Sequence, residues 1–156
     1  MVQGNLASTY RSLGRLDEAM QMRRDVYSAT VKLNGDEHND TLIEAANYAS
    51  LLIELKRFEE AKTLLRKSIP VARRVLGESH ELTLRMRWTY AIALYLNPGA
   101  TLDNLREAVT TLEDLTRSAR RVLGGAHPLT VDIEEELRDA RAALRARETP
   151  SSSPGA

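Results

Sequence analysis

Apolar residues recur every three or four positions along most of this 156-residue chain, the spacing that places them on one face of a helix. Between residues 39 and 56, for example, one such face is formed by Leu42, Ala45, Ala49, Leu52 and Leu55. Short polar or glycine-containing segments interrupt this pattern and mark the ends of helices. We therefore predict seven helices, at residues 2–13, 16–33, 39–56, 58–76, 81–96, 101–123 and 128–147.

The helical pattern is itself repeated along the chain. The motif Gly-x-x-His-x-x-Thr, followed by Leu or Val, occurs three times, with its histidines at His38, His80 and His127. The first two copies lie 42 residues apart and the last two 47, because the segment 97–101 adds five residues. A period of this size predicts a solenoid of helical hairpins, in which neighbouring hairpins bury each other's apolar faces.

Several residues of the repeating pattern resemble those of a known family. They are Asn5-Leu6-Ala7, Tyr10, Gly14-Arg15, Ala19 and the segment from Gly124 to Pro128. With this period, they resemble the tetratricopeptide repeat (TPR), in the 42-residue form found in kinesin light chain. The resemblance implies an all-α fold, a right-handed α-solenoid of antiparallel helix hairpins. It also implies that the first helix of each hairpin lines a concave groove in which partners bind.

We expect the solenoid to span residues 1–148, with repeats at about 1–38, 39–80 and 81–127. The helix at 128–147 is expected to cap the stack, because it is apolar on one side and charged on the other. Residues 149–156, which are rich in Ser and Pro, are expected to form a disordered tail.

The N-terminal end of the repeat pattern differs from the C-terminal end. Met1 is in register with Ile43 of the next repeat, so the first predicted helix lacks its opening turn. A fragment of a longer array would look like this, and we favour that interpretation over a natural short start. Self-assembly through the uncapped N-terminal helix is therefore our alternative hypothesis for function, and a homo-oligomer its expected product.

Composition and charge argue against several classes of partner and reaction. Lys and Arg number 22, as do Asp and Glu, so no net charge favours nucleic acid or a membrane surface. The sequence has no cysteine, which excludes disulfides and thiolate metal sites and fits a cytoplasmic protein. Histidines on successive hairpins should lie about 10 Å apart, too far to share one metal ion. We expect no enzyme, no cofactor and no metal.

The candidate binding residues lie on the predicted first helices, along the concave face. They are Asn5, Ser8, Arg11, Asn47, Ser50, Arg85, Trp88, Thr89, Ile92 and Tyr95. Asn5, Asn47 and Thr89 are equivalent positions, and an amide there offers a donor and an acceptor to a peptide backbone. We predict a non-catalytic scaffold that binds a peptide or a segment of a protein partner in this groove.

The charged and aromatic candidates suggest two kinds of contact. Arg11 and Arg85 are suited to carboxylates, whereas Trp88 and Tyr95 are suited to an apolar side chain. Competing interpretations remain for two candidates, since Asn47 would serve equally well to tie neighbouring helices together and Trp88 to fill the core.

Overall fold

The computed structural model describes residues 15–149, which form six helices and no strand. The helices are α2 (Leu16–Asn34), α3 (Asn39–Glu54), α4 (Phe58–Leu76), α5 (Glu81–Leu96), α6 (Leu102–Val122) and α7 (Pro128–Glu148). The all-α prediction is confirmed, and the observed helices lie within two residues of the predicted ones. The predicted helix at 2–13, the candidates Asn5, Ser8 and Arg11, and all but the first residue of the predicted tail lie outside the described residues.

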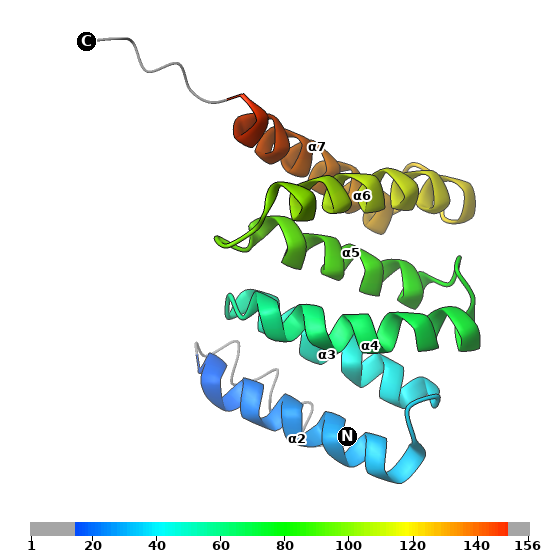
Figure 1. Cartoon of the computed structure of the whole chain (residues 1–156). Helices are drawn as coiled ribbons and strands as arrows, with labels where there is room; N and C mark the ends of the chain where they lie inside the picture. Colours follow the sequence, from blue (N-terminus) through cyan, green and yellow to red (C-terminus); the bar gives the residue numbers. More distant parts are fainter. Residues whose placement is uncertain (1–14, 150–156) are drawn as a thin grey trace.

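The helices follow one another along a single stack, from α2 at one end to α7 at the other (Figure 1). Each helix packs against the next one in sequence, and in addition α3 contacts α5 and α5 contacts α7. Within the described part of the chain, the backbones of α2, α4 and α6 do not approach one another closely, although side chains such as Arg24 and Glu60 link α2 to α4. The row α3–α5–α7 is therefore the tighter, inner side of the stack, and α2, α4 and α6 form the outer side.

The turn between α3 and α4 contains one residue with a left-handed backbone. Lys56 has a φ of 60°, and α3 ends at Glu54, two residues earlier than predicted. The N–H groups of Lys56 and Arg57 donate to the carbonyls of Ile53 and Leu52, at 2.9 and 2.8 Å. Gly14 occupies the equivalent sequence position one repeat earlier, where a left-handed residue is expected.

The second helix of each hairpin ends at a glycine, as predicted from the repeated motif. Gly35, Gly77 and Gly124 have φ values of 83°, 99° and 90°, a backbone conformation that other residues adopt only with strain. This shared geometry turns the chain from an outer helix back to the next inner one.

The core is divided into three successive apolar clusters rather than one centre. The first lies between α2, α3 and α4, the next between α3, α4 and α5, and the last between α5, α6 and α7. Alanines at equivalent positions have no exposed surface: Ala19, Ala61 and Ala108 on second helices, and Ala49 and Ala91 on first helices. These small side chains allow the helices to approach closely, as expected for a solenoid whose core is spread along a line.

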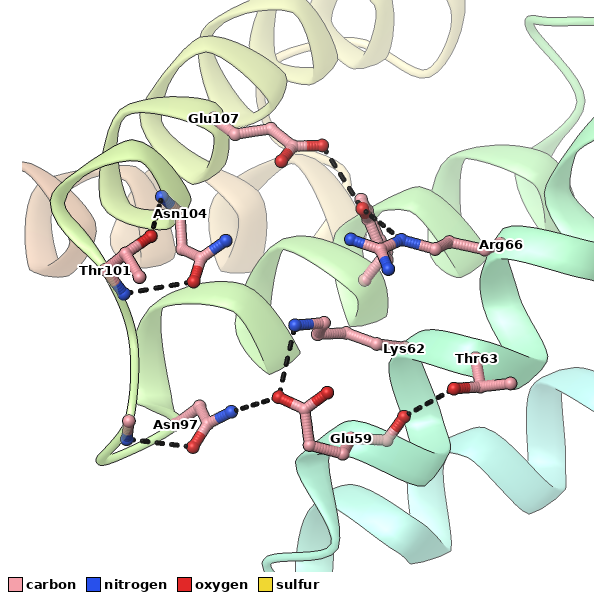
Figure 2. Close-up of polar contacts among 10 residues, drawn as sticks. Glu59, Lys62, Thr63, Arg66, Asn97, Thr101, Asn104 and Glu107 are labelled. Atoms are coloured by element: carbon pink, nitrogen blue, oxygen red, sulfur yellow. Dashed lines mark hydrogen bonds and ion pairs between the residues drawn. The ribbon is translucent and has the colours of Figure 1, made fainter.

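The five-residue insertion forms an ordered turn at the start of α6. Thr101 and Asn104 form a reciprocal capping box, with hydrogen bonds of 3.1 and 3.0 Å (Figure 2). The side chain of Asn97 donates to Glu59 of α4 at 2.8 Å, and Arg147 of α7 donates to the Ala100 carbonyl at 3.0 Å. The insertion is thus held by a helix on each side of it.

Candidate functional site

The inner side of the stack carries an open pocket of about 490 Å³ that involves three helices. Its lining residues are Ser50 from α3, Glu81, Arg85, Trp88 and Thr89 from α5, and His127, Pro128, Leu129 and Asp132 from the start of α7. Four of the predicted binding residues, Ser50, Arg85, Trp88 and Thr89, are therefore brought together at one place. A pocket of this volume lies in the range that binds small molecules or peptide side chains.

The charges at the rim of this pocket alternate in sign. The side chain of Arg85 is about half exposed, and its Nη2 lies 4.0 Å from Oε1 of Glu81, one turn earlier on α5. Asp132 lies on the opposite wall, on α7, and is exposed. The rim can therefore offer a cation to a carboxylate and a carboxylate to an amine of the same ligand.

Trp88 lies between the pocket and the core. Its ring is half-buried against the apolar cluster of α5, α6 and α7, and it also lines the pocket. Its indole Nε1 is buried and has no hydrogen-bond partner within the described part of the chain. One side of Trp88 thus packs in the core and another lines the pocket.

The remaining candidates on α3 and α5 are less exposed than a simple groove would suggest. Thr89 is buried and donates its hydroxyl to the Arg85 carbonyl at 3.0 Å, so its only proton is already engaged. Ile92 is 9% exposed and belongs to the core. Asn47 is half-buried, and its amide makes no hydrogen bond to any other described residue. Of these three side chains, that of Asn47 alone keeps its donors unengaged among the described residues.

Tyr95 connects two inner helices. Its hydroxyl donates to the Glu136 carboxylate on α7 in a very short contact. Burial raises the pKa of Glu136, and the nearby carboxylates Asp139, Asp132 and Glu135 raise it further, while the Tyr95 hydrogen bond opposes them. Burial, followed by the hydrogen bond to Glu136, also raises the pKa of Tyr95. The hydroxyl of Tyr95 therefore links α5 to α7.

Sequence reasoning missed Asp132 and Glu136, although the repeat contains a signal for both. Asp132 is equivalent to Arg85, and Glu136 to Thr89, each 47 residues later. The charges of α7 resemble those of a solvated cap, which obscures a full position-by-position comparison with α3 and α5. That comparison would have placed two carboxylates on the inner face.

The histidines have a structural role in this fold. Nδ1 of His38, His80 and His127 accepts a hydrogen bond from the backbone N–H two residues further on, at 3.1 Å in each case. Each histidine is thus the N-cap of α3, α5 or α7. Among residues 15–149, no three His, Cys, Asp or Glu side chains are grouped to hold a metal ion. Over the same range, no helix is both long and apolar enough to cross a bilayer.

Two family models, both described as tetratricopeptide repeat, match residues 1–40 and 41–97. Together these ranges cover more than half of the chain. No curated protein matches it.

Solved structures share the fold over nearly the whole chain. A variant form of the nearly identical TPR-like repeats from a putative kinesin light chain of Podosopora anserina is 25% identical, with a TM-score of 0.76. The match covers 94% of this chain and 66% of that one, just under two thirds of its length. A second structure of those repeats is 22% identical, with a TM-score of 0.80 over 98% of this chain and 78% of that one.

A more distant structure is BtubC (BKLC) from P. vanneervenii. It is 15% identical, with a TM-score of 0.59 over 99% of this chain and 67% of that one. At these identities the second and third structures show the fold alone. They agree with the predicted α-solenoid of helix hairpins.

Proposed function

The chain belongs to the tetratricopeptide repeat family, whose repeats generally mediate protein–protein interactions, and we propose that its inner face binds a peptide segment of a protein partner. The pocket of about 490 Å³ supports this proposal most directly, because α3, α5 and α7 all contribute to it. A site assembled from three successive inner helices suits an extended chain that runs along the stack.

The chemistry of the pocket suggests a segment of mixed character. Arg85 is available to a carboxylate, and Asp132 on the opposite wall to an amine or an amide. The exposed side of Trp88 offers an apolar surface between them. Asn47 lies further along the same face, with an amide free to bond the peptide backbone. These groups bind and orient a ligand, and we propose no reaction for them.

A selected peptide provides the test. A random peptide library would be panned against the protein, and the affinity of an enriched peptide measured by fluorescence anisotropy. The double variant Asn47→Ala/Arg85→Ala should weaken binding by about tenfold or more, since it removes one amide and one guanidinium from the contact.

The matched control is Gln21→Ala/Arg117→Ala, which removes the same two groups from the outer helices α2 and α6. It should leave the affinity unchanged. Equal weakening in both double variants would contradict the proposal. So would a melting temperature of Asn47→Ala/Arg85→Ala low enough for unfolding to explain its loss of peptide affinity.

A further inference from the structure

A second pocket, of about 230 Å³, lies away from the inner face, between α4, α5 and α6. Its lining residues are Arg66, Ile69, Pro70, Arg73, Arg87, Tyr90, Glu107 and Thr111. Three arginines and one glutamate give this lining a formal net charge of +2. Glu78 and Asp114 lie outside this lining but pair with Arg73 and Arg87, so the positive surface that faces the pocket is that of the arginine groups left unpaired.

The helix geometry aims two of the arginines at the same space. Arg66 and Arg73 are seven residues apart on α4, so they lie on one face about 10 Å apart along the axis. Ile69 and Pro70 lie between them and form an apolar floor. Arg87 approaches from α5 with a side chain only 10% exposed, fixed by Asp114 at 2.8 Å and Glu78 at 3.7 Å.

Arg66 and Arg73 on α4 are each held by a contact at Nε, but their terminal nitrogens still have hydrogen-bond donors to offer. Arg66 donates from Nε to the Tyr90 hydroxyl at 3.2 Å, and that hydroxyl donates to Glu107 at 3.1 Å (Figure 2). Arg73 lies with its Nε 2.9 Å from Glu78. In the described part of the chain, the Nη groups of both arginines have no hydrogen-bond partner. Each guanidinium is therefore held in place by its Nε while its terminal donors remain available.

We propose that this pocket binds a phosphate group, either free phosphate or a phosphate monoester. A tetrahedral dianion offers oxygens on several sides, so the Nη groups of Arg66 and Arg73 can both bond to it from opposite ends of the floor. Arg87 closes the buried side, where Asp114 and Glu78 balance its charge, and Thr111 also lines the pocket. A carboxylate carries one negative charge rather than two, so it should bind more weakly than phosphate.

Inorganic phosphate is the first probe, titrated by calorimetry and by amide NMR in a phosphate-free buffer of low ionic strength, with acetate in parallel. We expect saturable phosphate binding, shifts of amides near Tyr90 and Thr111, and much weaker binding of acetate. The double variant Arg66→Gln/Arg73→Gln should raise the dissociation constant by about tenfold or more.

The matched control is Arg74→Gln/Arg121→Gln, which changes the net charge equally but leaves the pocket intact. It should bind phosphate like the unmodified protein, and circular dichroism melts should show that both double variants fold. Absence of phosphate binding, equal binding of acetate, or equal weakening in both double variants would overturn the proposal.

A serine peptide in phosphorylated and unphosphorylated forms identifies the source of the phosphate group. Tighter binding of the phosphopeptide than of inorganic phosphate would support a phosphorylated partner segment. Equal affinity for the two would support a free phosphate ligand. Equal binding of both peptide forms, undiminished in Arg66→Gln/Arg73→Gln, would contradict the proposed site.

Discussion

Arg66 donates from Nε to the hydroxyl of Tyr90 at 3.2 Å, and Arg24 makes the same bond to Tyr48 at 3.1 Å one repeat earlier. In both cases the arginine belongs to an outer helix and the tyrosine to the inner helix of the next hairpin. The tyrosine hydrogen bond raises the pKa of each arginine. Repeat periodicity thus extends beyond the apolar core to a polar link between hairpins.

Removing the hydroxyl of Tyr90 should weaken this junction. Tyr90→Phe deletes an acceptor for Arg66 and a donor to Glu107 while it keeps the ring, so we expect a loss of about 0.5–1 kcal/mol in the free energy of unfolding. Urea denaturation measures it. A double-mutant cycle with Arg66→Gln isolates the pair, and a coupling energy of zero would show that the bond does not contribute.

The left-handed Lys56 should be improved by glycine. This backbone conformation costs a residue with a side chain about 1 kcal/mol, and glycine adopts it without that cost. We expect Lys56→Gly to raise the free energy of unfolding by about 0.5–1 kcal/mol in a urea titration.

Lys32→Gly is the control for that substitution, because Lys32 lies in the last turn of α2 with an ordinary helical backbone. It should lower stability, by about 0.5–1 kcal/mol. The same sign of change in both variants would mean that the strain at Lys56 is not relieved by glycine.

Glu136 should make the protein less stable as the pH rises. Its pKa is raised above the ordinary value of 4.5, so the folded state holds its proton more tightly than the unfolded state does. Stability is lost as the pH rises from that value through the folded pKa. Glu136→Gln should therefore have a higher melting temperature than the unmodified protein near pH 7 and lose that advantage near pH 4.

Glu134, two residues earlier on α7, should behave in the opposite way. A hydrogen bond from Arg120 lowers the pKa of Glu134. The contribution of Glu134 to folding stability is therefore present above its ordinary pKa and is lost as the pH falls through the folded pKa. Glu134→Gln should not gain stability near pH 7. A pH-independent melting difference for Glu136→Gln would contradict the role assigned to burial.

Close helix packing at Ala91 should not accommodate a larger side chain. Ala91 has no exposed surface in the cluster between α5, α6 and α7, so Ala91→Leu should cost about 1–3 kcal/mol by overpacking. The exposed Ala142 on α7 is the control, and Ala142→Leu should change stability by less than about 0.5 kcal/mol. Similar denaturation midpoints for the two variants would argue against tight packing at this junction.

Self-assembly through residues 2–13 stays a prediction, because that segment lies outside the described residues. Light scattering after size exclusion, over a series of concentrations, measures the mass in solution. A mass that rises with concentration would support assembly, and a monomer throughout would exclude it over the range measured. The cytoplasmic location likewise stays a prediction, to be checked by microscopy of the tagged protein.

Most of the fold could be predicted from the sequence because it depends on local signals. The apolar spacing, the glycines that end each second helix and the repeated histidine caps each act within a few residues. The end of α3 was placed two residues late, since Leu55 continues the apolar pattern while Lys56 leaves the helix. Turn geometry at a residue other than glycine leaves little trace in the sequence.

The candidate sites could be predicted less completely, because they depend on pairs of helices. Arg85 and Trp88 were found from their face of one helix, whereas Asp132 reaches the same pocket from another helix. The bond from Tyr95 to Glu136 joins residues 41 positions apart, across the junction shifted by the insertion. In the sequence, Arg66 and Arg73 resemble ordinary surface residues of α4. The pocket that they line exists only because α5 and α6 supply its other walls.

The division of the core into three clusters has a mechanical consequence. Among the described residues, each hairpin packs only against its neighbours, and no contact joins α2 to α7 directly. A force applied to the two ends would therefore be resisted by one junction at a time rather than by the whole molecule. Under tension, neighbouring hairpins should therefore separate one junction at a time, while the remaining hairpins keep their structure.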